Sequence, residues 1–219
     1  MTVAALPALS GEDLVRRARE RLSFDLPADL FGKDYAVRDP GSHFVDGWSG
    51  VRLKTAKAAA VLVPVVDHRP EATILLTKRV TTLRAHSGQI AFPGGRIDPG
   101  DASPAAAALR EADEEIGLAA RHITPLGYLD PYLIGTGYLV IPTVALVTPP
   151  FRMTLNPDEV ANAFEVPLAF LMEPGNHKRQ SREFGGTLRS FYAMPYAEWN
   201  IWGATAGMLR NLYDRLYAP

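Results

Sequence analysis

The feature that most constrains the fold of this chain is a helix whose two ends are both specified by the sequence. Ser103 provides a side chain that can cap the helix, and Pro104 suits the first helical position. A run of alanines follows, which favours helix, and Gly117 can adopt the left-handed conformation that ends one. The sequence therefore predicts a helix over residues 104–116.

The acidic residues of this helix stand where they are electrostatically unfavourable. Its C-terminal half, at the negative end of the helix dipole, contains Glu111, Asp113, Glu114 and Glu115. Each carboxylate placed there destabilises the helix by an amount comparable to the ~0.3–1 kcal/mol by which a carboxylate at the N-terminal end stabilises it. We expect Arg110 to be the one cation close enough to offset them. A local rule broken in this way indicates a functional site.

The spacing of the glutamates suggests what that site holds. Glu111, Glu114 and Glu115 are three or four positions apart or adjacent, so they can present oxygens on one side of the helix. Oxygen donors without nitrogen or sulfur favour hard cations, Mg²⁺ or Mn²⁺. The preceding loop contains Gly94 and Gly95, and a backbone carbonyl of either could complete the site. The alternative is a solvated acidic face beside an ordinary turn.

Composition excludes several other kinds of function. The chain has no cysteine, which excludes disulfides, iron–sulfur clusters and cysteine-based zinc sites. Its net charge of −1 provides no general attraction for nucleic acid. Residues 1–9 lack the features of a signal peptide, and the uncharged residues 131–151 are interrupted repeatedly by proline and glycine. We therefore expect a cytoplasmic protein that binds neither nucleic acid nor a membrane.

The rest of the chain predicts an α/β protein. We expect an N-terminal extension over residues 1–55, with a helix after Ser10 and an irregular part at 24–54, and one domain over residues 56–219. Periodicity and turn residues predict strands at 58–66, 72–77, 127–129, 138–147 and 186–192. They also predict a short strand passing into a turn at 165–171 and a closing helix at 203–216. Strands mixed with two core helices suggest an α/β/α or α+β layer fold.

Residues 95–118 resemble the Nudix hydrolase family. The family box has a glycine, five residues, a glutamate and seven residues, followed by a segment that residues 110–118, READEEIGL, match closely. This chain departs from the box in having Asp101 in place of the glutamate and eight residues between Asp101 and Arg110. The resemblance implies a Nudix-type α/β/α sandwich with a mixed β-sheet, here with the N-terminal helical and irregular extension.

The segment upstream looks like the signature of the coenzyme A diphosphatase branch of that family. Residues 75–79 read LLTKR and residues 83–95 read LRAHSGQIAFPGG, and the branch shares Asp101 and the additional residue. Val80 departs from this signature, which usually has Ser or Ala there. The resemblance implies a metal-dependent diphosphatase that cleaves coenzyme A or acyl-CoA into 3′,5′-ADP and 4′-phosphopantetheine or its acyl form.

Two other functions stay open at this point. A Nudix hydrolase could act on another nucleoside diphosphate derivative, such as ADP-ribose or NADH, and a Nudix ligand sensor would lack catalysis altogether. The intact acidic residues at 111, 114 and 115 favour an enzyme. In each case the expected partner is a small nucleotide, and a homodimer is compatible with the sequence.

The resemblance also implies roles for individual residues. Glu111, Glu115, Glu114 and the carbonyl of Gly95 would hold Mg²⁺ or Mn²⁺. Arg110 would orient Glu111 through a charge-assisted hydrogen bond, and it could also pair with Glu114 one turn further along.

The general base and the substrate-binding residues are less closely defined. The base would be a glutamate of the box, Glu111 or Glu114, or else Glu159, whose alternative role is a carboxylate at the start of a helix. The residues of the branch signature that could contact the diphosphate or the 3′-phosphate are Arg79, Arg84, His86 and Gln89. The basic run at 177–182 is a further candidate, with a solvated loop as its alternative.

Overall fold

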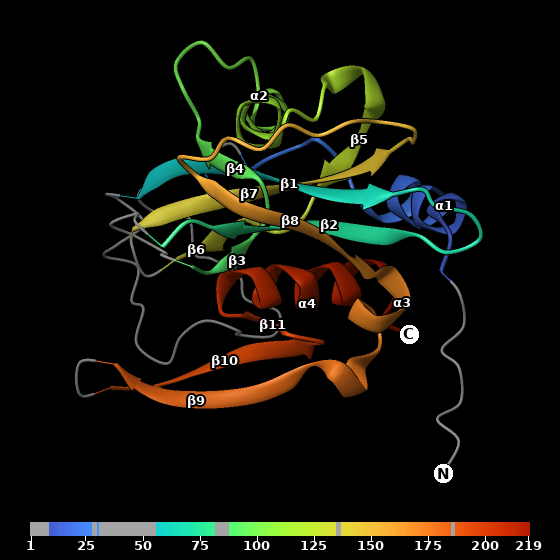
Figure 1. Cartoon of the computed structure of the whole chain (residues 1–219). Helices are drawn as coiled ribbons and strands as arrows, with labels where there is room; N and C mark the ends of the chain where they lie inside the picture. Colours follow the sequence, from blue (N-terminus) through green and yellow to red (C-terminus); the bar gives the residue numbers. More distant parts are fainter. Residues whose placement is uncertain (1–8, 28–29, 31–55, 82–87, 135–136, 185–186) are drawn as a thin grey trace.

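Helices and sheets alternate in layers in this protein, seen here in a computed structural model (Figure 1). The structure describes residues 9–27, 30, 56–81, 88–134, 137–184 and 187–219. Helix α2 (Pro104–Ile116) covers one face of an eight-stranded sheet. Helix α4 (Ala204–Leu216) lies on the opposite side, between that sheet and a three-stranded antiparallel sheet. The arrangement agrees with the expected α/β/α sandwich.

The large sheet is mixed, as expected. Its strands are β1 (Lys57–Val66), β2 (Thr73–Arg79), β3 (Ile90–Ala91), β4 (Gly94–Arg96), β5 (Ile123–Tyr128), β6 (Tyr132–Leu133), β7 (Tyr138–Val147) and β8 (Val160–Pro167). The central path runs β3-β2-β1-β7-β5, while β4 pairs with β1, β6 with β7 and β8 with β2. Strands β1 and β7 run parallel, and the other described pairings in this sheet are antiparallel. Both central strands are buried on the two faces, which explains their continuous apolar sequence.

Helix α2 begins and ends where the sequence predicts. The Ser103 hydroxyl accepts a hydrogen bond from the Ala106 N–H at 3.1 Å, and Gly117 has φ 65° and ψ 21°. Its small buried face of Ala107, Ala108 and Ala112 packs against the sheet within one apolar cluster. Small side chains bring the helix close to the strands, so its acidic end lies near strands β2 and β4.

Helix α1 (Gly11–Arg21) joins the described N-terminal residues to the rest of the core. Ser10 caps it by accepting a hydrogen bond from the Asp13 N–H at 3.1 Å. Leu14 and Ala18 are completely buried in the same apolar cluster as α4. Arg17 donates a hydrogen bond to the Leu216 carbonyl at 3.0 Å. Most of the predicted irregular part at 24–54 lies outside the described residues.

Several elements differ from the sequence prediction. The predicted strand at 127–129 begins earlier, at Ile123 of β5. The short strand passing into a turn that is predicted at 165–171 is confirmed in kind, since β8 ends at Pro167 and a single turn, α3 (Leu168–Leu171), follows, but the strand begins earlier, at Val160. The small sheet contains β9 (Lys178–Phe184), β10 (Thr187–Tyr196) and β11 (Trp199–Trp202), and β9 and β11 were not predicted. Strand β9 is solvent-exposed at residues 178–183, so it lacks the apolar alternation that identifies a strand. The short 3-10 helices are η2 (Ala120–His122) and η3 (Pro174–Asn176).

No helix within the described ranges combines the length and the apolar character that a membrane span requires.

His177 links the single turn α3 to helix α4 through its two ring nitrogens. It is 8% exposed, and its Nε2 lies 2.7 Å from the Leu171 carbonyl oxygen, so that nitrogen donates the hydrogen bond. Its Nδ1 faces the guanidinium of Arg210 at 3.5 Å and acts as the acceptor. Burial lowers the pKa of His177 below its ordinary value, and the charge of Arg210 adds to this effect.

We predict that His177 makes folding stability decrease in mild acid. Because its pKa is lower in the folded state, the unfolded chain binds the extra proton more readily. The contribution is complete above about pH 6.5, the ordinary pKa of histidine, and is lost as the pH falls toward the folded pKa. Urea unfolding between about pH 7.5 and 5.5 measures it, with His177→Gln as the variant that cannot titrate. The variant should lose less stability than wild type over this range, and equal losses would contradict the prediction.

Candidate active site

Strand β4 places two glycines directly against the acidic end of α2. Gly94 and Gly95 pair with Val61 and Ala60 of β1. A Cβ atom on Gly95 would lie 2.5 Å from the carboxyl carbon of Glu111, and one on Gly94 would overlap the Ala60 carbonyl. A side chain at Gly94 would overlap backbone atoms, and one at Gly95 would displace the carboxylate of Glu111, so the backbone of β4 lies directly against the glutamates of the helix. These glycines form a strand and not the ordinary turn given as their alternative.

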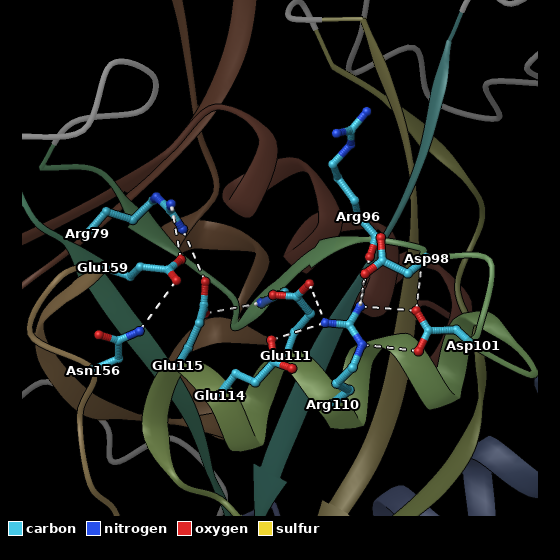
Figure 2. Close-up of polar contacts among 11 residues, drawn as sticks. Arg79, Arg96, Asp98, Asp101, Arg110, Glu111, Glu114, Glu115, Asn156 and Glu159 are labelled. Carbon is cyan, nitrogen blue, oxygen red and sulfur yellow. Dashed lines mark hydrogen bonds and ion pairs between the residues drawn. The ribbon is translucent and has the colours of Figure 1, made fainter.

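Arg110 is the centre of a hydrogen-bond network that joins the helix to the loop before it (Figure 2). Its Nε and Nη2 donate to the two carboxylate oxygens of Asp101 at 3.1 and 3.0 Å. Its Nη1 donates to Glu111 at 3.0 Å and to Glu114 at 3.1 Å, so both hydrogen bonds expected of Arg110 are present. Nη2 also donates to the Arg96 carbonyl at 3.0 Å. The guanidinium lowers the pKa of Asp101. The paired hydrogen bonds between Arg110 and Asp101 fix the loop before the helix.

Glu115 is the most deeply buried carboxylate of the site, at 1% exposure. Its Oε1 accepts a hydrogen bond from the Arg79 Nη1 at 3.2 Å, and its Oε2 accepts one from the Gly94 N–H at 3.2 Å. Burial nevertheless raises the pKa of Glu115 to about 7, and repulsion from Glu159 and Glu111 acts in the same direction. Two donors therefore compensate the buried charge only in part.

Glu111 and Glu159 complete the group of facing carboxylates. Burial raises the pKa of Glu111, and the nearby charges of Glu114 and Glu159 raise it further. Glu159 stands in a turn directly before β8, so the alternative position at the start of a helix is wrong. Its carboxylate accepts a hydrogen bond from Asn156 Nδ2 at 3.4 Å and is 41% exposed.

Asn156 holds this turn against the helix, a role the sequence analysis did not assign. Its backbone N–H donates to the Glu115 carbonyl at 2.9 Å, and its carbonyl accepts from the Val160 N–H at 2.9 Å. Its side-chain oxygen also accepts from the Asp158 N–H at 3.1 Å. The signal was the Asn-Pro-Asp sequence, which is typical of a turn that asparagine organises through its own side chain.

The expectation that Arg110 alone offsets the acidic residues is wrong, because Arg79 does so as well. Arg79 is the last residue of β2, and Figure 2 shows its guanidinium facing the carboxylates of both Glu115 and Glu159. Its Nη2 lies 4.0 Å from the second of these carboxylates. Local sequence could not reveal this contact, since the strand reaches the helix only through the fold.

The remaining candidates for substrate binding have different outcomes. Gln89 lies beside Arg79, and its carbonyl accepts a hydrogen bond from the Arg79 backbone N–H at 3.0 Å. Arg84 and His86 fall outside the described residues. In the basic run at 177–182, His177 is buried and bonded to Leu171, and the others form the exposed strand β9 instead of a loop.

The donor chemistry of this site fits a divalent cation. The carboxylates that face one another supply oxygen donors, and the pKa values of Glu111 and Glu115 are raised by burial and further by neighbouring negative charge. Within the described part of the chain, no three His, Cys, Asp or Glu side chains converge closely enough to form a complete metal cage. The two arginines occupy carboxylate oxygens that a cation would otherwise use.

Comparison with known proteins agrees with the geometry. A family model described as the NUDIX domain matches residues 56–185. The chain is 44% identical over 156 residues to an uncharacterized Nudix hydrolase, NudL, of Cronobacter sakazakii, covering 71% of this chain and 81% of that protein. It is 42% identical over 158 residues to NudL of Photorhabdus laumondii, covering 72% and 84%. Among solved structures, the NUDIX domain of Shewanella oneidensis NrtR complexed with ADP ribose superimposes with a TM-score of 0.47 at 16% identity, covering 78% of this chain and 94% of that one.

The family model covers more than half of the chain, and it includes the loop, the helix and the turn that build the carboxylate site. The chain therefore belongs to the Nudix family, and it is a hydrolase that acts on pyrophosphate bonds.

Proposed function

We propose that this Nudix hydrolase cleaves the diphosphate bond of coenzyme A or acyl-CoA, releasing 3′,5′-ADP and 4′-phosphopantetheine or its acyl form. The observation that carries the proposal is the contact of Arg79, at 3.2 Å, with the buried Glu115. This contact joins the signature segment at 75–95, on which the choice of coenzyme A rests, to the acidic helix on which the chemistry rests. In the same proposal the enzyme is cytoplasmic, its partner is a small nucleotide, and a homodimer stays a prediction.

Nudix hydrolases generally use divalent metal ions, and we assign their binding here to Glu111, Glu114, Glu115 and the carbonyl of Gly95. Bound Mg²⁺ or Mn²⁺ would neutralise charge on the diphosphate and lower the pKa of a bound water. The assignment is supported by the oxygen-only donor set and by the crowding of carboxylates where α2 meets β4.

The chain's own residues then position the reacting groups. Arg110 holds Glu111 and, through Asp101, the loop that joins strand β4 to helix α2. Glu159 is our first choice for the general base, because it is held by Asn156 yet accessible to solvent. It would take the proton of the attacking water as the water oxygen bonds to phosphorus, while the bond from that phosphorus to the bridging oxygen breaks and the other phosphate leaves with that oxygen. Glu111 and Glu114 are the alternatives for this role.

The first test is a product assay by mass spectrometry. Coenzyme A, ADP-ribose and NADH are each incubated with Mg²⁺ or Mn²⁺, with wild type and with Glu115→Gln. We expect 3′,5′-ADP and 4′-phosphopantetheine from wild type, with a loss of ~100-fold or more in the variant, since metal stabilisation is worth several kcal/mol and each 1.4 kcal/mol is tenfold.

Asp113→Asn is the matched control for this assay, because Asp113 is an exposed carboxylate on the same helix and outside the proposed site. It should retain wild-type turnover. Cleavage of another diphosphate without cleavage of coenzyme A would refute the substrate, and ligand binding without any turnover would favour the sensor.

A second prediction concerns the close approach of β4 to the helix. Gly95→Ala should reduce kcat strongly with little loss of thermal stability, because the new methyl group would displace only the mobile end of the Glu111 side chain. Gly100→Ala is the control, since a Cβ there meets no atom within 4 Å. Steady-state kinetics and thermal unfolding of both variants measure the effect. Equal activity of the two variants would argue against a role for this contact.

A third prediction concerns recognition of the 3′-phosphate by Arg84. Arg84→Ala should raise KM for coenzyme A more than KM for dephospho-coenzyme A, because only the former carries the phosphate that the guanidinium would bind. Kinetics with both substrates provide the comparison. An equal rise for the two substrates would exclude this role.

A further inference from the structure

The ion pair of Arg79 suggests a second role for this residue. Its guanidinium contacts two carboxylates from different elements, Glu115 on α2 at 3.2 Å and Glu159 before β8 at 4.0 Å (Figure 2). It is therefore placed where the carboxylates of the site face one another, and where our proposed function requires a divalent cation.

We propose that Arg79 is the internal counter-ion of the metal-free enzyme, which competes with the divalent cation for Glu115 and is released toward the substrate diphosphate when the cation binds. This inference rests on the proposed metal site. It adds that one residue, Arg79, couples metal binding to substrate binding.

The burial of Glu115 makes this competition direct. At 1% exposure its carboxylate has little access to water, and its two oxygens already accept hydrogen bonds from Arg79 and from the Gly94 N–H. A cation that binds the same carboxylate would repel the adjacent guanidinium, and repulsion between like charges is strong where water is largely excluded. The cation would also supply the positive charge for which Arg79 is needed in its absence.

The two arginines of the site differ in how firmly they are held. Arg110 makes a bidentate contact with Asp101 and three further hydrogen bonds, to Glu111, Glu114 and the Arg96 carbonyl. The guanidinium of Arg79 has one hydrogen bond and one longer ion pair among its contacts with described residues. Among the described residues, fewer contacts therefore oppose movement of the Arg79 guanidinium than oppose movement of Arg110.

If Arg79 leaves Glu115, its guanidinium can bind the diphosphate of the substrate. The planar guanidinium binds phosphate oxygens through paired hydrogen bonds as well as it binds carboxylates. Metal and diphosphate would then favour the same position of Arg79, so each would increase the affinity of the protein for the other.

The test is a titration of the full-length protein with Mn²⁺, with free Mn²⁺ followed by electron paramagnetic resonance and no substrate present. Arg79→Gln should bind Mn²⁺ roughly 5-fold or more tightly than wild type, at the lower end of typical coupling between ligands. The same variant should show a higher KM for coenzyme A. Unchanged or weaker Mn²⁺ binding by Arg79→Gln would overturn the proposal.

Lys78→Gln is the matched control, because Lys78 is a cation on the same strand that lies over the ring of Trp199 at 5.5 Å instead of facing the carboxylates. Its Mn²⁺ affinity should equal that of wild type. An equal gain in both variants would mean that general charge causes the effect, and this would also overturn the proposal.

A measurement on the wild-type protein avoids any folding defect of Arg79→Gln, which leaves Glu115 buried without its ion pair. The Nη–H resonances of Arg79, assigned with Arg79→Lys, are followed by nuclear magnetic resonance during addition of Mg²⁺, because Nη1 donates to Glu115. Their exchange with water should become faster, while that of the Arg110 guanidinium stays slow. Unchanged protection of Arg79 at saturating Mg²⁺ would contradict its release.

The measurement of Mn²⁺ binding tests this inference, and the measurement of coenzyme A cleavage tests the proposed function. Tighter Mn²⁺ binding by Arg79→Gln together with no cleavage of coenzyme A would leave the counter-ion role intact and refute the substrate. Cleavage of coenzyme A together with unchanged Mn²⁺ affinity of Arg79→Gln would support the proposed substrate and refute the counter-ion role. If neither wild type nor Arg79→Gln binds Mn²⁺, the inference fails.

Discussion

The burial of negative charge where α2 meets β4 is the constraint on which the rest of this structure depends. Glu115 lies almost wholly out of water, and desolvation of a carboxylate is costly unless hydrogen bonds and opposite charge compensate it. The compensation comes from β4, through the Gly94 N–H, and from β2, through Arg79. The helix, the glycine strand and the end of β2 must therefore be held together for this charge to remain buried.

The two arginines divide this task between them. Arg110 fastens the outer carboxylates of the helix to the loop through Asp101, and its contacts all come from residues close to it in the sequence or from the loop before the helix. Arg79 reaches the inner carboxylate from another strand and holds it with fewer contacts. The outer carboxylates are thus held by an arginine with many described contacts, and the inner one by an arginine with few. This asymmetry fits a hydrolase whose site must accept charged ligands repeatedly.

Much of the fold was visible in local sequence signals. The caps at Ser103 and Gly117 defined α2 at both ends, and the continuous apolar runs identified the central strands β1 and β7. Strand β9 gave no such signal because it is exposed. The short strand β4 was also not predicted, because its role is to bring a backbone close to the helix and not to bury side chains.

The sequence by itself determined the acidic helix and the contacts of Arg110 with Glu111 and Glu114, because these lie within one short segment and follow from helix geometry. Only the tertiary structure decided which carboxylate is buried, that Arg79 is its partner, and that Asn156 holds Glu159 at the edge of the site. These contacts join elements far apart in the chain, and side-chain spacing along one element carries no information about them. Burial then sets the charge balance of the site, since a carboxylate depends on its donors only where water cannot replace them.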